Sequence, residues 1–429
     1  MGNFHRLSAK KGVLLKNTVM LYILQFSTYI LSFIVVPYET RVLGPEAYGL
    51  LGVATAFMVY FQLVIDFGFM LSSTEDVSRE REDKGKICRI FTTVTVDKLF
   101  LAALSAAALF ALCALVPKWQ GHTELFFLFF IATAVNSMMP DYLYRGLERM
   151  SAITIRSVII KTFFTVMIFV FLRTPEDIII IPILNIIGNA TALLFVYLHI
   201  SKKLGIWFCR FDPGEAVSSL RRSLTFFYSR IASTAYTAMN TLILDLMAGG
   251  GGAAVGFYTS ADKVVTTAKN GMSPISDSLY PYMVKNRDFA LVKKVLMLLM
   301  PVIIIGCVIV FIFARPLCLW FFGAEYGDVA PVLRVMLPVV AVILPSYICG
   351  FPMLSAMGLS RYANYSVIFG SCLHIFNLLV LYFSGHLNMV TLGALVSVAE
   401  TAILVFRLIV IYRYRALLHP ADSEENNAD

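Results

Sequence analysis

Long apolar runs alternate with short polar connections along most of this 429-residue chain. Many runs reach the roughly 20 residues that a helix needs to cross a bilayer core of about 30 Å. Backbone polar groups in hydrocarbon need partners within the protein, so continuous helices are expected; the alternation of a membrane β-strand is absent from the sequence. The pattern predicts an all-α integral membrane protein with about 12 transmembrane helices. The predicted spans are 17–37, 48–71, 90–115, 124–143, 153–172, 177–199, 223–247, 253–279, 291–314, 331–356, 362–383 and 388–412.

The composition agrees with this pattern, because 59% of the residues are hydrophobic and 14% are charged. Soluble domains carry about 25% charged residues. The first apolar run follows a basic leader without a small-residue cleavage site, so we expect a retained first span. The 7 cysteines fall mostly within apolar runs and lack metal-binding spacing. They are interpreted as small buried hydrophobic residues, and no metal and no cofactor are predicted.

Basic residues are distributed unevenly between the two sides of the membrane. The chain holds 35 Lys and Arg residues against 27 Asp and Glu residues, a net charge of +8. Most basic residues outside the spans lie in the N-terminal segment, in alternate connections and in the C-terminal tail. This bias predicts that both termini are cytoplasmic. Because topology accounts for most of the charge, no nucleic-acid partner is predicted. The loops of the opposite side hold Arg41, Lys118, Arg173, Arg315 and Arg334.

A weak internal repeat divides the chain. The segment Leu43–Leu50 is a glycine-marked turn between two predicted spans, and a similar turn, Gly250–Phe257, follows 207 positions later. An even number of spans in each half keeps the halves parallel, so we predict two six-helix lobes related by a pseudo-two-fold axis along the membrane normal. The predicted divisions are an N-terminal lobe (1–205), a cytoplasmic linker (206–222), a C-terminal lobe (223–415) and a disordered tail (416–429).

Ionisable side chains inside predicted spans are the candidates for function, because they are costly in hydrocarbon and usually face a cavity or a partner. In the span 253–279, Lys263, Thr266 and Asn270 share one helical stripe, with Lys269 near its edge. Residues of the span 223–247 follow helical spacing as well. An Asp–Lys pair that only joins helices is the alternative interpretation of the first stripe. The second stripe consists of Arg230, Ser233, Thr234 and Thr237.

Four further charged residues interrupt apolar spans. Lys161 is an additional cationic candidate. Asp66, Asp262 and Glu400 are candidates for binding a coupling ion, with an ion pair within the bundle as the alternative for Glu400. Asp66 lies near a predicted cytoplasmic end, where hydration would cost little.

Clustered cations in a low-dielectric groove suit phosphate or carboxylate oxygens, since charge-assisted hydrogen bonds are short and strong. An amphiphile with an anionic head and a lipid tail would fit such a groove. The sequence has no GxxxxGK[ST] motif and therefore no visible ATPase. No paired carboxylates or Ser/His arrangement suggests catalysis, so the protein is not expected to be an enzyme.

Several stretches resemble one family of membrane transporters. They are Arg41–Gly49, Asp66–Phe69, Val255–Lys263, Ser273–Ile275, Leu279–Pro281, Phe322–Gly323, Glu325–Tyr326 and Leu333–Arg334. Together they resemble the polysaccharide repeat-unit flippases (Wzx-type, O-antigen and related), in the superfamily that also holds multidrug exporters of the MATE type and lipid II flippases. The last two spans add only hydrophobicity.

The resemblance implies a multi-pass protein of the bacterial cytoplasmic (inner) membrane. It implies transfer of an undecaprenyl-pyrophosphate-linked oligosaccharide to the outer leaflet by alternating access, driven by an ion gradient. The partners would be this polyprenyl-pyrophosphate-linked oligosaccharide, the lipid bilayer and the polysaccharide polymerase machinery. Lys263 and Lys269 are the residues that the resemblance places in the lumen. A multidrug exporter of the same fold, which would need an acidic lumen, and a membrane scaffold without transport remain alternatives.

Overall fold

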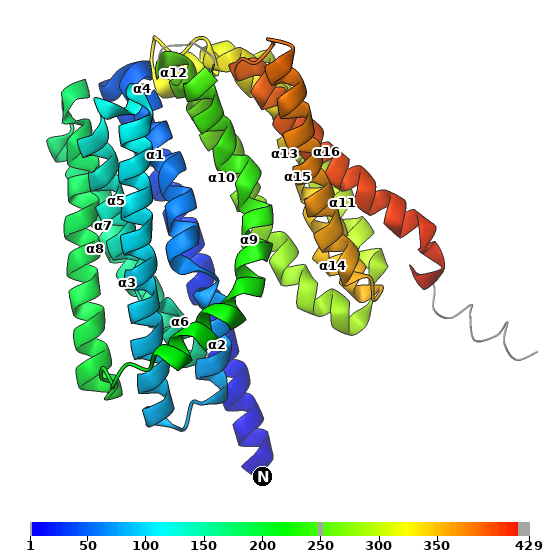
Figure 1. Ribbon diagram of the computed structural model, residues 1–429. Helices are drawn as coiled ribbons and strands as arrows, with labels where there is room; N and C mark the ends of the chain where they lie inside the picture. The colour runs from blue at the N-terminus through cyan, green and yellow to red at the C-terminus, as the bar shows by residue number, and fades with distance from the viewer. Residues whose placement is uncertain (1, 248–251, 419–429) are drawn as a thin grey trace, which may run out of the picture. The chain divides into compact units, whose positions relative to one another are not determined.

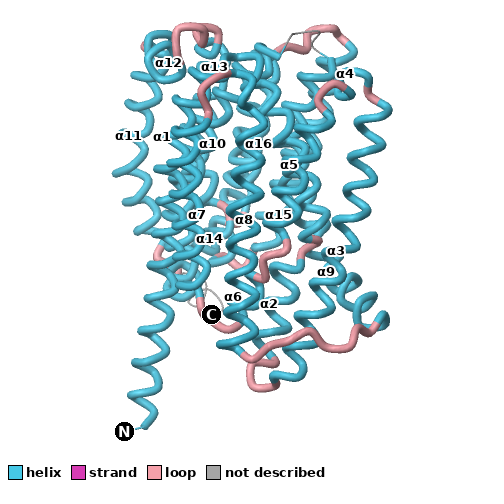
Figure 2. The backbone as a smooth tube through the Cα atoms, turned by 90° about the vertical axis from the view of Figure 1, so that its left-hand side faces the viewer, coloured by secondary structure: helices cyan, strands magenta, loops and turns pink. Residues whose placement is uncertain are grey.

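The computed structural model describes residues 2–247 and 252–418, and these form helices joined by loops, with no strand among them (Figures 1 and 2). The chain divides into two compact units. The first unit comprises 1–47 and 51–234, and the second comprises 48–50 and 235–429. The predicted tail from 419 onwards lies outside the described residues.

The first unit holds eight α-helices and the beginning of a ninth. They are α1 (Gly2–Asp66), α2 (Phe69–Arg79), α3 (Lys84–Leu115), α4 (Pro117–Gln120), α5 (Thr123–Ser137), α6 (Asp141–Gly146), α7 (Met150–Phe171), α8 (Ile180–His199) and the start of α9 (Pro213–Met247), with a 3₁₀ turn at Pro175–Ile179 and a π turn at Ile200–Leu204.

A kink at Gly44 separates the first two predicted spans, both of which belong to α1. Gly44 has φ 70° and ψ 173°, a left-handed conformation that glycine adopts at little cost. Pro45 follows, and its missing N–H and fixed φ suit the first position of the next helical segment. The segment ends at Asp66, because Phe67 (φ 37°) and Gly68 (φ 82°) leave the helical region. The glycine-marked turn predicted here therefore separates two helical segments of α1 at Gly44.

The core of the first unit lies where α2, α3, α6 and the end of α8 meet. Phe69, Phe91, Leu143 and Tyr144 are buried there. On the other side, α7 packs against α8, and α5 packs against α8. The Tyr38 hydroxyl on α1 donates to the carbonyl of Leu172 at 2.6 Å, which connects α1 to the end of α7.

The second unit holds the remaining long helices. They are the end of α9, α10 (Gly252–Asn286), α11 (Phe289–Ile312), α12 (Ala314–Phe322), α13 (Val329–Cys349), α14 (Phe351–Ala356), α15 (Ser360–Phe383), α16 (Met389–Arg413) and a 3₁₀ turn at Arg415–Leu418.

Helix α13 is the centre of the second unit, since it packs against α10, α11 and α16. Close approach of α15 to α16 depends on Gly370, because a Cβ atom there would lie 2.4 Å from the Ile403 side chain. By contrast, the most apolar window of α11 has no buried residues. Exposed aliphatic side chains along an entire span indicate a helix that faces lipid.

Nine helical stretches of the described residues are long and apolar enough to cross a membrane. Each predicted span lies mainly in one helix: two lie in α1, and the others in α3, α5, α7, α8, α9, α10, α11, α13, α15 and α16. The predicted spans 48–71, 124–143 and 331–356 also cross a break and end in α2, α6 and α14. Helices α9 and α10 are not among these nine stretches, because their polar residues lower their hydropathy. The region predicted as a linker (206–222) is coil only in part, because α9 already begins at Pro213.

Candidate functional site

Helix α10 has two distinct faces. Tyr258, Ala261 and Val265 are at most 1% exposed and pack into the second unit. Lys263 and Thr266 are exposed on the other side of the helix. Lys263 lies about 17 Å along the helix from its first residue, at 1.5 Å per residue. If α10 crosses the membrane, as the sequence predicts, an exposed lysine so far along it requires water or an anionic group beside it.

Lys269, which lies deeper along the same helix, has a fixed partner. Its Nζ atom lies 2.5 Å from Oε1 of Glu400 on α16. The Lys269 side chain is 16% exposed and that of Glu400 is 5% exposed. The cation and the carboxylate that the sequence suggested for separate roles therefore form one buried ion pair. Glu400 therefore compensates the charge of Lys269 in this structure.

A second buried ion pair lies in the first unit. Lys98 Nζ on α3 is 3.0 Å from Oδ1 of Asp66 at the end of α1, and it donates to the carbonyl of Ser137 at 2.6 Å. The Asp66 side chain is 12% exposed, so it is buried in this ion pair rather than hydrated. Three helices, α1, α3 and α5, meet at this pair.

The remaining predicted residues are dispersed. Lys161 on α7 and Arg230 on α9 are half-buried in the first unit, and Asp262 and Asn270 are half-buried on α10. Lys269 and Lys263 act electrostatically on Asp262. The side chains predicted to continue the stripe of Arg230 lie outside the described ones; they are Ser233, Thr234 and Thr237.

Sequence reasoning missed a chain of buried hydrogen bonds in the second unit. His374 Nε2 on α15 lies 2.8 Å from Oδ1 of Asn240 on α9. The amide nitrogen of Asn240 donates to the Tyr258 hydroxyl at 3.0 Å. His374 and Asn240 are both 0% exposed. His374 interrupts the apolar run 360–383, so the rule that identified Glu400 could have identified it too.

Arg407 is another buried charge whose position the sequence left open. Its Nε donates to Oγ of Ser366 at 2.8 Å, and its Nη1 donates to the carbonyl of Ser346 at 2.6 Å. The guanidinium also lies close to Gly350, where a Cβ atom would be 2.9 Å from Nη1. Arg407 thus joins α16 to α13 and α15, a structural role.

Asp97 on α3 differs from the paired acids. It is 3% exposed, and its carboxylate lies near the Ser219 hydroxyl on α9. Within the described part of the chain, its Oδ2 atom has no hydrogen-bond partner. A buried carboxylate oxygen without a donor is costly, so this oxygen suits a proton or a small cation.

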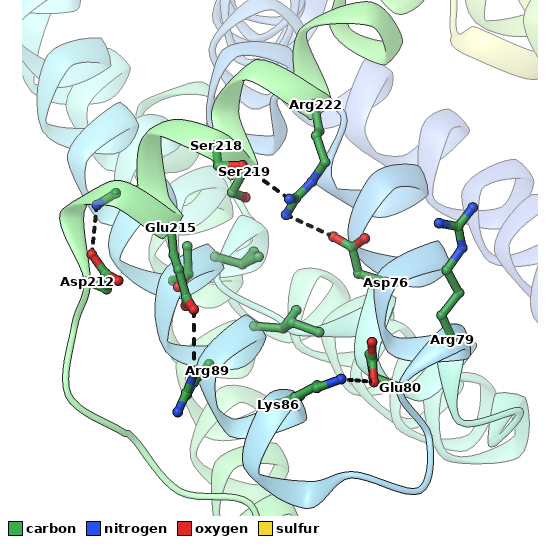
Figure 3. A pocket seen from close by; sticks show the side chains of 14 residues that line it. Asp76, Arg79, Glu80, Lys86, Arg89, Asp212, Glu215, Ser218, Ser219 and Arg222 are labelled. Atoms are coloured by element: carbon green, nitrogen blue, oxygen red, sulfur yellow. Dashed lines mark hydrogen bonds and ion pairs between the residues drawn. The ribbon is translucent and has the colours of Figure 1, made fainter.

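Close to Ser219, α2, α3 and the start of α9 enclose a polar cavity of about 590 Å³ (Figure 3). Two ion pairs connect α9 to the other helices: Arg222 to Asp76 at 3.3 Å and Arg89 to Glu215 at 3.8 Å. The charged residues that line the cavity are Asp76, Arg79, Glu80, Lys86, Arg89, Asp212, Glu215 and Arg222. Acids and bases are balanced, so this cavity has no preference for an anion.

These features define an α-helical integral membrane protein, and solved structures share its fold. An inward-facing multidrug resistance MATE family transporter of the MOP superfamily aligns over 93% of this chain and 99% of its own, with a TM-score of 0.67 and 15% identity. The lipid II flippase MurJ, in an inward closed conformation, aligns over 93% of this chain and 87% of its own, with a TM-score of 0.68 and 13% identity.

The sequence itself identifies the family. Residues 14–287 match the family described as "Polysaccharide biosynthesis protein", and the chain belongs to this family. A Shigella dysenteriae protein named "Putative O-antigen transporter" is 26% identical over 410 residues, 94% of this chain and 99% of that protein. A protein of the same name from Escherichia coli (strain K12) is 26% identical over 275 residues, 64% of this chain and 66% of that protein.

Proposed function

We propose that the protein is a flippase that moves polyprenyl-pyrophosphate-linked oligosaccharide repeat units from the cytoplasmic to the outer leaflet of the bacterial inner membrane. The family membership supports a role in polysaccharide assembly, and the names of the two relatives support transport of O-antigen precursors. The fold shared with a lipid II flippase is compatible with a lipid-linked substrate.

The observation that carries the proposal is the exposed Lys263, which lies a third of the way along α10. Its face of the helix also presents Thr266 and Asn270, whereas the opposite face is buried. A cation flanked by hydroxyl and amide groups suits a pyrophosphate with attached sugars. Arg230 and Lys161 are the other cations proposed for the substrate path.

We propose that transport is coupled to an ion through Asp97. Of the candidate acids, Asp66 and Glu400 already neutralise lysines, and Asp262 lies within the electrostatic influence of Lys269 and Lys263. The buried Oδ2 of Asp97 has no partner within residues 2–247 and 252–418. Protonation or cation binding at this oxygen would remove an unfavourable buried charge, and the Ser219 hydroxyl near the carboxylate would pass the change to α9.

Deletion of the gene tests the function directly. The proposal requires that lipid-linked repeat units accumulate in the inner leaflet and that surface polymer is lost, with both restored by the wild-type gene. Restoration should fail with Lys263→Ala and succeed with Lys285→Ala, a matched lysine near the end of the same helix. Unchanged polymer together with drug hypersensitivity would instead indicate a multidrug exporter. Unchanged polymer without a drug phenotype would indicate a scaffold.

A further inference from the structure

The first unit has a second cavity, of about 570 Å³, between α7 and α8. Its walls are mostly apolar side chains that are also exposed on the outside of the unit: Ile159 is 63% exposed and Phe195 is 66% exposed. Both helices are long and apolar enough to cross a membrane. The cavity is therefore a groove that opens towards lipid, and we call it the α7–α8 groove. Its principal apolar lining residues are Ile155, Ile159, Phe163, Ile187 and Phe195.

One end of the groove is polar and basic. His199 Nδ1 lies 2.8 Å from the Tyr144 hydroxyl, and Arg156 Nη2 lies 2.8 Å from Oδ1 of Asp141. The Nε atom of Arg156 is buried and has no hydrogen-bond partner within the described residues. Two more cations, Arg149 and Lys203, act electrostatically on His199.

The charges at this end favour an anion. Arg149, Arg156 and Lys203 carry three positive charges, and Asp141 carries one negative charge that faces Arg156. Arg156 lines the groove, and a phosphate oxygen could accept a hydrogen bond from its guanidinium in competition with Asp141. Such charge-assisted bonds are roughly twice as strong as neutral ones. The sequence places this end of the groove on the cytoplasmic side, next to the connections 144–152 and 200–222.

We infer that the α7–α8 groove holds the hydrocarbon chain of a polyprenyl diphosphate, with the diphosphate at Arg156 and the chain between α7 and α8. This inference rests on the proposed function and adds the place where the lipid part of the substrate binds from the inner leaflet. A single groove suits a single-chain lipid, whereas a phospholipid brings two chains and only one phosphate. Flat aromatic and branched aliphatic walls suit a methyl-branched chain.

The test measures binding of undecaprenyl diphosphate to the full-length purified protein by native mass spectrometry, with phosphatidylglycerol as the comparison lipid. Ile159→Trp should fill the groove and weaken binding about tenfold or more. Leu194→Trp is the matched control, because Leu194 is 60% exposed on α8 but does not line the groove, and it should leave binding unchanged.

Two polar substitutions separate a headgroup site from a structural ion pair. Arg156→Gln should weaken binding about tenfold, which corresponds to the loss of one bond to a charged group. Asp141→Asn should strengthen binding, because it releases Arg156 for the diphosphate. If both substitutions weakened binding equally, the pair would be only structural and the inference would be wrong.

The failures of this inference and of the proposed function can be told apart. Wild-type binding that Ile159→Trp does not change would overturn the groove and leave the flippase function intact. Equal affinity for phosphatidylglycerol and undecaprenyl diphosphate would make the groove a site for ordinary membrane lipid, against the inference. No binding by the wild type would also overturn it, and the polymer phenotype of the deletion strain would then decide the proposed function separately.

Discussion

The Nζ atom of Lys269 lies 2.5 Å from Oε1 of Glu400, and this ion pair joins α10 to α16 within the second unit. Each side chain would be costly alone in a membrane interior. As a pair they neutralise each other. The cost of an unpaired charge in the membrane therefore does not identify either residue, taken alone, as functional. Lys263 lies six residues earlier and is exposed, so we still propose it as a cation that binds the substrate.

Removal of one partner of this pair should destabilise the protein. Lys269→Met leaves Glu400 buried without its counter-charge, and Glu400→Gln leaves Lys269 without its own. Breaking a buried pair costs about 3–5 kcal/mol, and we expect each single variant to lose thermal stability in detergent.

The exchanged double variant, Lys269→Glu with Glu400→Lys, provides the control. It should recover stability relative to either exchange alone, because the pair forms again with opposite orientation. Transport by the stable double variant would show that the pair is structural. A stable double variant without transport would show that the position of the positive charge is itself required.

Much of the fold could be predicted from the sequence because hydrophobic run length reports directly on membrane crossing. The kinked turn at Gly44-Pro45 could be located, since those residues restrict the backbone locally. Helices α9 and α10 could also be placed despite their polar residues. The helical start at Pro213 was missed because the charged residues after it read as a solvated linker.

The pairing of charges could not be predicted from the sequence. Glu400 lies 131 positions from Lys269, and Asp66 lies 32 positions from Lys98. Helical periodicity shows which side chains share one face of a helix. It does not show which other helix packs against that face. The α7–α8 groove was missed for the same reason, because Arg156 and His199 gain their common setting only when α7 packs on α8.

The hydrogen bonds of His374 should matter more than its ability to carry charge. His374→Gln can still bond to Asn240 Oδ1, and it should retain near-normal stability. His374→Leu leaves Asn240 and its buried polar groups without that bond, at a cost of about 1–3 kcal/mol. Thermal unfolding of the purified variants measures the difference, and equal stability of the two would contradict the structural role of the bond.

Cys209 can report on the predicted topology. It is exposed in the coil before α9. Partial loss of hydration and the neighbouring Cys88 thiol raise the pKa of Cys209 above its usual value. A membrane-impermeant maleimide should therefore label it in inverted vesicles but not in intact cells, with a rate that rises as the pH rises because the thiolate is the reactive form. Cys209→Ser is the control. Labelling in intact cells would place this coil outside.

Asp97 offers the sharpest test of ion coupling. If its buried Oδ2 takes up the coupling ion, Asp97→Asn should stop gradient-driven transport in proteoliposomes, because the amide cannot gain or lose a proton or bind a cation as strongly. The same variant should fold normally, since it removes an uncompensated buried charge and keeps an oxygen for Ser219. Ser219→Ala should weaken coupling without abolishing it, as the carboxylate remains. Normal gradient-driven transport by Asp97→Asn would exclude this residue as the coupling site. Asp262, which is half-buried on α10, would then be the next candidate.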